Sequence, residues 1–288
     1  MPRPSVSFEV FPPRSDKGRD TLLQATRDFA KADPDFISVT YGAGGSTRTK
    51  SVETAALLQS RTGLSITGHL TCAGQSRAEV LETAEAYRAA GITRILALRG
   101  DPTDGADHYT PHPDGFATSC DLIETLAKDG FDVTVAAYPD PHPDSRGTTQ
   151  DLDWLKRKQD AGASAAITQF SFSPERYLRP RDAAATAGVT LPLIAGILPV
   201  KDWDKARRFA KSCGAPIPLE LEQAFDTAER HDRARLFALT QATELCTELV
   251  SNGMTDLHFY TLNSADLTLD ICTALGAAPR QDPLSNAA

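Results

Sequence analysis

One glutamate stands in an apolar segment near the start of the chain, in Ser7-Phe8-Glu9-Val10-Phe11-Pro12-Pro13-Arg14. Burying a carboxylate is costly unless the group is paired or takes up a proton. A glutamate in such a strand is therefore more typical of an acid with a shifted pKa than of a packing error. An ion pair with Arg14 or Arg99 is the structural alternative. The two prolines end the strand, which leaves Glu9 close to its carboxyl end.

The elements that must position this residue follow an alternating pattern of short apolar segments and longer amphipathic ones. The expected strands are 6–11, 36–40, 65–70, 94–98, 132–137, 165–170, 193–197 and 256–260. The expected helices are 19–32, 47–61, 76–90, 119–129, 149–161, 174–187, 202–213, 230–252 and 264–275. The expected helix N-caps are Ser46, Ser76, Thr148 or Thr149, Ser173 and Ser264.

Eight strands interleaved with helices predict a parallel sheet closed into a (β/α)8 TIM barrel. We expect a single domain over residues 1–288, with a frayed tail over about 277–288. A doubly wound open sheet is the alternative. It is disfavoured because no G-x-G-x-x-G follows any strand, and the glycines of 42–46 miss that spacing.

The composition of the chain argues against several classes of function. The net charge of -8 and the pI near 5.3 argue against nucleic acid or an anionic membrane as a partner. No apolar run reaches membrane-spanning length and the first residues lack a signal peptide, so we expect a cytoplasmic protein. The five cysteines include no C-x-x-C, which favours reduced thiols and no metal site.

Polar side chains gather at the predicted carboxyl ends of the strands, where the active site of such a barrel lies. They are Glu9, Thr40, Tyr41, His69, Arg99, Asp101, Tyr138, His142, Gln169, Tyr260 and Asn263. Singly, each has an ordinary explanation: His69 could be a core histidine, and Lys156-Arg157-Lys158 a solvated helix face. Their shared location predicts one pocket.

Eight segments resemble, in order, those of the methylenetetrahydrofolate reductase family, over about residues 5 to 276. They are 8–14 (FEVFPPR), 38–43 (SVTYGA), 68–72 (GHLTC), 97–101 (ALRGD), 135–139 (VAAYP), 166–170 (AITQF), 196–200 (GILPV) and 258–263 (HFYTLN). The chain is similar to the short bacterial form, which has the catalytic barrel alone.

The resemblance implies reduction of 5,10-methylenetetrahydrofolate to 5-methyltetrahydrofolate, with FAD as cofactor and NADH or NADPH as co-substrate. Glu9 would be the general acid that assists opening of the folate ring, and Asp101 would lie between flavin and pterin. Gln169 would contact folate and nicotinamide, and Phe209 would pack on the bound substrate. Ser264 stands where the better-known bacterial enzymes carry a folate-binding arginine.

The resemblance also implies a set of FAD contacts. They are Thr40, Tyr41, His69, Arg99, Gly100, Asp101, Ser119, Tyr138, His142, Asp151, Trp154, Arg157 and Lys158. Trp154 departs from the small polar residue usual in the family, and Lys205 from a glutamine. Barrels of this family usually form homo-oligomers. A reductase without FAD that passes hydride directly from nicotinamide to folate, and a folate- or flavin-binding protein without turnover, are the alternatives.

Overall fold

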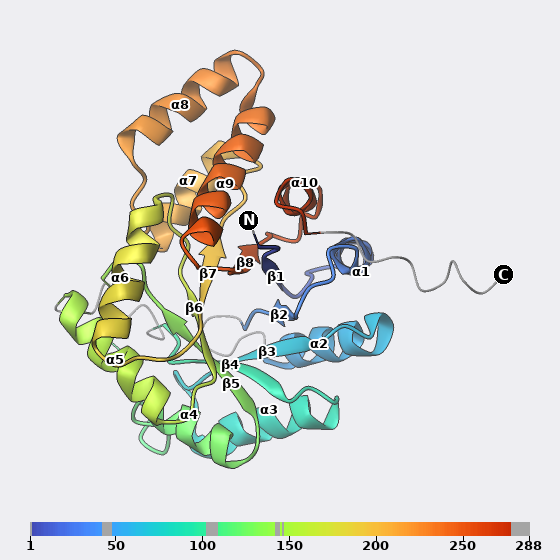
Figure 1. Ribbon diagram of the computed structural model, residues 1–288. Coiled ribbons are helices and arrows are strands. Elements are labelled where there is room, and N and C mark those ends of the chain that lie inside the picture. Colours follow the sequence, from blue (N-terminus) through green and yellow to red (C-terminus); the bar gives the residue numbers. More distant parts are fainter. Residues whose placement is uncertain (1, 42–47, 102–108, 142–144, 146, 278–288) are drawn as a thin grey trace.

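The computed structural model describes residues 2–41, 48–101, 109–141, 145 and 147–277. Eight parallel strands close in chain order into a barrel with helices around it (Figure 1), which confirms the predicted (β/α)8 fold. The strands are β1 Ser5–Val10, β2 Ile37–Val39, β3 Ile66–Thr71, β4 Arg94–Leu98, β5 Asp132–Ala137, β6 Ala165–Thr168, β7 Leu193–Ile197 and β8 Asp256–Tyr260.

The described part of the chain forms ten helices. They are α1 Asp16–Ala30, α2 Arg48–Thr62, α3 Arg77–Ala89, α4 Ser119–Lys128, α5 Thr148–Asp160, α6 Pro174–Thr186, α7 Trp203–Ser212, α8 Leu219–Arg230, α9 Ala234–Ser251 and α10 Asp266–Ala274. Helices α7 and α8 are inserted between β7 and α9 (Figure 1).

The expected helix over 230–252 was wrong at its start, and α8 was not predicted. Asp232 adopts a left-handed φ of 54°, which ends α8 and separates it from α9. The aromatic ring of Trp203 stacks on Phe225 at 4.3 Å between centroids, so α7 and α8 pack together. The insertion therefore follows the carboxyl end of β7, where it can border the mouth of the barrel.

Two expected N-caps are confirmed. The Ser76 hydroxyl accepts from the backbone N–H of Glu79, whose carboxylate accepts in return from the Ser76 N–H. Ser173 precedes α6, with Pro174 as the first helical residue. Ser46 lies outside the described residues.

Two other expected N-caps are wrong. Gly147 precedes α5, and its φ of 126° is a conformation that glycine adopts without steric cost. Ala265 precedes α10 in place of Ser264, whose hydroxyl instead donates to Asp266 at 2.7 Å.

The barrel interior has an apolar part and a polar part. Phe36, Leu96 and Ile167 form a buried cluster that is separate from the main core between strands and helices. A second set of fully or nearly buried side chains is polar, namely Ser7, Ser38, Thr67, His69 and His258. Ser7 and His258 are hydrogen-bonded to each other, whereas the Thr67 hydroxyl and Nε2 of His69 have no hydrogen-bond partner among the described residues.

Two strand glycines make room for tyrosine rings. A Cβ on Gly196 would lie 2.1 Å from the carbonyl oxygen of Thr168 and 2.7 Å from the Tyr260 ring. A Cβ on Gly68 would lie 2.6 Å from the ring of Tyr87. The first contact therefore packs β6, β7 and β8 together, and the second packs α3 closely on β3.

The structure contains no helix, among the residues it describes, with the length and apolar character needed to cross a membrane.

Candidate active site

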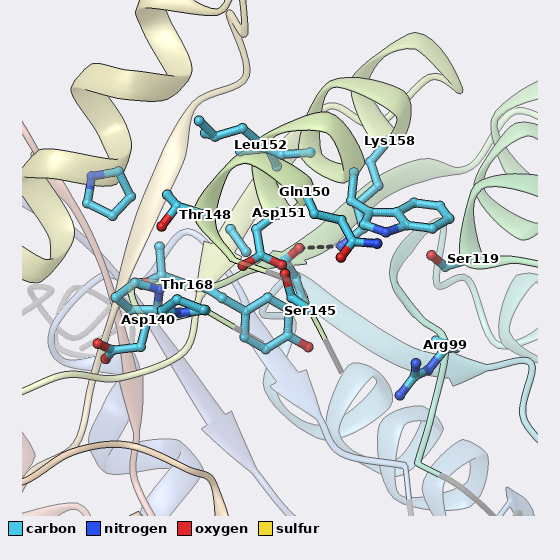
Figure 2. A pocket seen from close by; sticks show the side chains of 18 of the residues that line it. Arg99, Ser119, Asp140, Ser145, Thr148, Gln150, Asp151, Leu152, Lys158 and Thr168 are labelled. Atoms are coloured by element: carbon cyan, nitrogen blue, oxygen red, sulfur yellow. Dashed lines mark hydrogen bonds between the residues drawn. The ribbon is translucent and has the colours of Figure 1, made fainter. Parts of the chain in front are cut away.

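A cavity of about 1140 Å³ opens at the carboxyl ends of β4 and β5 and reaches the helices α5 and α6 (Figure 2). Nine residues expected to contact FAD line it: Tyr41, Arg99, Gly100, Asp101, Ser119, Tyr138, Asp151, Trp154 and Lys158. Residues from five separate segments of the chain therefore meet in one hollow, as the barrel geometry predicts.

Three expected FAD contacts do not line this cavity. Thr40 follows β2, and its carbonyl accepts from the Ser51 hydroxyl at 2.8 Å. His69 lies inside the barrel, and Arg157 is exposed with its guanidinium 5.1 Å over the Trp154 ring. His142 lies outside the described residues.

Lys158 places a cation in the cavity wall. Its Nζ donates to the Ala136 carbonyl at 2.7 Å, and burial lowers its pKa to about 8. The charges of Cys120 and Asp151 oppose that shift. The interpretation of Lys156-Arg157-Lys158 as a solvated face is therefore wrong for Lys158, because consecutive helical residues point in different directions.

Arg99 is held by its neighbours at the end of β4. Its guanidinium lies 4.8 Å from the centroid of the Tyr109 ring, and its Nε donates to the Gly100 carbonyl at 3.2 Å. The Cys72 thiol donates to the Arg99 carbonyl at 3.3 Å. Tyr109 was not among the predicted residues, and its place in the long loop after β4 was the one available signal.

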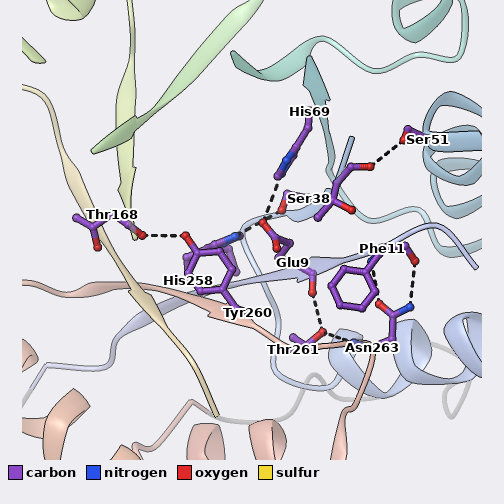
Figure 3. A network of polar contacts seen from close by, with 12 residues as sticks. Glu9, Phe11, Ser38, Ser51, His69, Thr168, His258, Tyr260, Thr261 and Asn263 are labelled. Atoms are coloured by element: carbon purple, nitrogen blue, oxygen red, sulfur yellow. Dashed lines mark hydrogen bonds and ion pairs between the residues drawn. The ribbon is translucent and has the colours of Figure 1, made fainter. Parts of the chain in front are cut away.

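The Glu9 side chain is 13% exposed, and its Oε2 lies 3.7 Å from Nε2 of His69 (Figure 3). Burial raises the pKa of Glu9 to about 8, so the carboxyl holds its proton at neutral pH. An ion pair with Arg14 or Arg99 would lower the pKa instead. The raised pKa of Glu9 therefore favours a protonated acid over an ion pair with Arg14 or Arg99.

The histidines near Glu9 are neutral. Burial lowers the pKa of both His69 and His258 to about 3, so the contact between His69 and Glu9 joins two uncharged groups. The rings differ in their partners: Nδ1 of His258 lies 2.8 Å from the Ser7 hydroxyl, whereas Nε2 of His69 has no hydrogen-bond partner among the described residues. Neither histidine therefore supplies a positive charge that would pull the proton off Glu9.

The backbone around Glu9 is held by the loop that follows β8 (Figure 3). The Thr261 hydroxyl donates to the Glu9 carbonyl at 2.6 Å. The Asn263 side chain accepts from the Phe11 N–H at 2.8 Å and donates to the Phe11 carbonyl at 3.0 Å. Asn263 therefore positions the end of β1, whereas the sequence had suggested a place in the pocket.

Aromatic side chains border the Glu9 side of the mouth. Phe209 on α7 stacks on Phe170 at 5.5 Å between centroids, with an interplanar angle of 21°. The Phe170 ring also contacts Tyr260 edge-on at 5.9 Å. Gln169 is half-buried, and its Oε1 accepts from the N–H of Phe170. Gln169 and Phe209 thus approach the same aromatic cluster from two elements.

Cys213 is a half-buried thiol that follows α7. Burial raises its pKa, a hydrogen bond with Ser212 opposes that shift, and the carboxyl groups of Glu9 and Asp101 would add to it when ionised. Asp101 also lines the large cavity. Sequence analysis did not single out Cys213 as a site residue.

Ser264 follows β8 and contacts a cation. Its hydroxyl accepts from the Nζ of Lys201 at 3.0 Å, and the same ammonium lies 2.9 Å from Asp266. A positive charge therefore lies beside Ser264, the position at which the resemblance had implied the loss of a folate-binding arginine.

The closed parallel barrel and the ionisable groups at its carboxyl end define a (β/α)8 enzyme. The family model described as methylenetetrahydrofolate reductase matches residues 2–276. The chain belongs to this family of oxidoreductases, as the resemblance predicted.

Two curated relatives and one solved structure show the range of similarity. The 5,10-methylenetetrahydrofolate reductase of Escherichia coli is 40% identical over 278 residues, which cover 96% of this chain and 92% of that protein. Methylenetetrahydrofolate reductase (NADH) 1 of Arabidopsis thaliana is 33% identical, covering 94% of this chain and 48% of that protein. A Clostridium thermocellum protein that binds two copies of 5-methyl-5,6,7,8-tetrahydrofolic acid shares the fold, with a TM-score of 0.61, 13% identity and coverage of 95% and 96%.

Proposed function

We propose that the protein reduces 5,10-methylenetetrahydrofolate to 5-methyltetrahydrofolate with bound FAD, and that Glu9 is the general acid. The observation that carries this proposal is a carboxyl group at the barrel mouth whose pKa is about 8. Catalysis by an acid is most effective when its pKa lies near the working pH. Family membership supplies the reaction, and the protonated Glu9 supplies the chemistry it needs.

The residues that line the cavity fit FAD. The guanidinium of Arg99 and the ammonium of Lys158 suit the diphosphate oxygens. The rings of Tyr138 and Trp154 offer apolar walls, and the carboxylate of Asp151 can accept from ribose hydroxyls. When bound, FAD supplies two-electron hydride chemistry, and the protein contributes orientation and electrostatics.

The groups around Glu9 suit a folate ring. The Glu9 carboxyl can donate its proton to a ring nitrogen, which favours opening of the five-membered ring to the reactive iminium. Asp101 can accept hydrogen bonds from the pterin, and the amide of Gln169 can bind polar edges of either substrate. The stacked Phe170 and Phe209 rings offer a flat apolar surface for an aromatic substrate.

NADH is the donor to test first, because the Arabidopsis relative carries it in its name. The test is anaerobic spectroscopy of the purified protein. We expect a yellow protein that bleaches with NADH and regains its colour when methylenetetrahydrofolate is added.

A colourless protein that takes up no added FAD and does not oxidise NADH in the presence of the folate would contradict the proposal. Folate-dependent oxidation of NADH without any bound FAD would instead support direct hydride transfer and overturn the role of the flavin.

A further inference from the structure

A tyrosine that no sequence motif singled out lines the large cavity. Tyr109 belongs to the long connection between β4 and α4, and its side chain is half-buried. It shares the cavity wall with Arg99 at the end of β4 and with Ser119 at the start of α4. Tyr109 is therefore close enough to the proposed FAD site to influence the residues that would bind the cofactor.

Three contacts join Tyr109, Arg99 and Cys72 into a closed ring of interactions. The Arg99 guanidinium lies 4.8 Å from the centroid of the Tyr109 ring, within the range of a cation–π contact. The Tyr109 hydroxyl lies 3.7 Å from Cys72 Sγ, and the same sulfur lies 3.3 Å from the Arg99 carbonyl. The side chain and the backbone of Arg99 are thus both tied to this pair of residues.

The hydrogen bonds of this ring have a fixed direction. A thiol has one hydrogen, and that of Cys72 is donated to the Arg99 carbonyl. The Tyr109 hydroxyl must therefore donate its own hydrogen to Cys72 Sγ. Burial raises the pKa of both the Cys72 thiol and the Tyr109 hydroxyl, so both hydrogens remain in place at neutral pH.

The segment that follows Tyr109 is anchored to the start of α3. The Arg77 N–H donates to the Asp114 carbonyl at 2.8 Å, and the Arg77 guanidinium lies 4.3 Å from the centroid of the buried Phe116 ring. These contacts fix the segment 109–118 against the carboxyl end of β3, where Cys72 lies. The Tyr109 ring is therefore held beside Arg99 by the fold as well as by the cation–π contact.

We propose that Tyr109 is a positioning residue for FAD binding, because its ring holds the Arg99 guanidinium in the orientation that meets the diphosphate. The inference rests on the proposed function, which assigns the diphosphate contact to Arg99. A long side chain that is ordered before the ligand arrives loses less conformational entropy on binding. A ring that contacts the guanidinium through its π face also takes none of the N–H donors for a hydrogen bond of its own.

The test is equilibrium binding of FAD to the full chain, freed of bound flavin and followed by flavin fluorescence. Tyr109→Leu removes the ring, and we expect FAD to bind about fivefold more weakly. Tyr109→Phe keeps the ring and loses only the hydroxyl, so its affinity should stay within about twofold of the wild type.

A double-mutant cycle separates positioning from direct contact with FAD. If Tyr109 acts through Arg99, adding Tyr109→Leu to Arg99→Met should weaken FAD binding no further. The matched control is Phe131→Leu, which breaks another arginine–ring contact, that of Arg88 at 4.2 Å, at the amino end of β5. It should bind FAD as the wild type does. Circular dichroism checks that each variant is folded.

Wild-type affinity for FAD in Tyr109→Leu would overturn the inference. A fivefold loss that persists in the Arg99→Met background would also overturn it, since Tyr109 would then act on FAD without Arg99. Both results would leave the proposed function standing. A wild-type protein that binds no FAD would instead overturn the proposed function and this inference together.

Discussion

At Glu9, the burial that keeps the carboxyl protonated also makes folding depend on pH. The folded state holds the proton up to a pKa of about 8, whereas the unfolded chain releases it near 4.5. Below pH 4.5 Glu9 is protonated in both the folded and the unfolded protein, so its burial costs no stability through ionisation. Between these two pKa values the unfolded state binds fewer protons, so stability falls as pH rises.

Glu9→Gln removes this loss, because the amide keeps the shape of the protonated carboxyl and never ionises. We expect the variant to exceed the wild type in free energy of unfolding by about 2 to 4 kcal/mol at pH 8, and by little at pH 5. Denaturant unfolding across about pH 5 to 8 measures the difference. The control, Glu229→Gln on an exposed part of α8, should show no such trend. If the Glu9→Gln protein follows the pH slope of the wild type, the buried protonated acid is refuted.

Asn263 holds the strand that carries Glu9 through its two hydrogen bonds to the backbone of Phe11. Asn263→Ala leaves both groups of Phe11 without these partners, so we expect a loss of roughly 1 to 3 kcal/mol in unfolding free energy. We also expect slower reduction of the folate, since Glu9 is then less well placed. Asn252→Ala, which removes an exposed amide from the end of α9, should have a much smaller effect on both. Equal effects of the two substitutions would contradict a positioning role for Asn263.

Among the strands, β6, β7 and β8 meet where Gly196 faces the ring of Tyr260, whose hydroxyl donates to the Thr168 carbonyl at 2.8 Å. Gly196→Ala would force its Cβ against backbone and ring, so we expect a loss of about 3 kcal/mol or more. Gly63→Ala is the control, because its surroundings are open and only its φ of 65° is strained. That strain costs about 1 kcal/mol. Thermal unfolding measures both, and similar costs at the two positions would argue against this contact.

The strands and most helices could be predicted because their apolar periodicity and flanking glycines are local properties. Helix α8 was missed, although Leu219–Arg230 is rich in good helix formers and follows Pro218, a residue typical of helix starts. What its own sequence does not record is its packing, in which the buried Phe225 stacks on Trp203 and meets the ring of Phe237 on α9 edge-on.

Some residues of the candidate site could likewise be predicted from local sequence patterns, and others could not. The carboxyl ends of strands are readable from sequence, and Glu9, Arg99 and Asp101 were found there. The roles of Tyr109 and Asn263 depend on how distant loops fold back onto strands, which no local pattern records. The burial of Lys158 beside an exposed Lys156 depends on which side of α5 faces the cavity.

For the whole molecule, a ligand that binds only the folded state raises stability by mass action. FAD at about one hundred times its dissociation constant would add about 2.7 kcal/mol, which raises the melting temperature by several degrees in a protein of this size. Lys158→Met should reduce this shift strongly, because it removes the cation from the cavity wall. Lys156→Met on the exposed side of α5 should retain it. Equal shifts in the two variants would contradict the placement of FAD against Lys158.

In the proposed function, one protonated carboxyl, Glu9, carries the acid step of folate reduction. Stopped-flow measurement of the two half-reactions in Glu9→Gln tests it most directly. We predict that NADH still bleaches the flavin of the variant, while methylenetetrahydrofolate restores the colour at least about a hundredfold more slowly than in the wild type. Restoration of the colour at the wild-type rate would contradict the account.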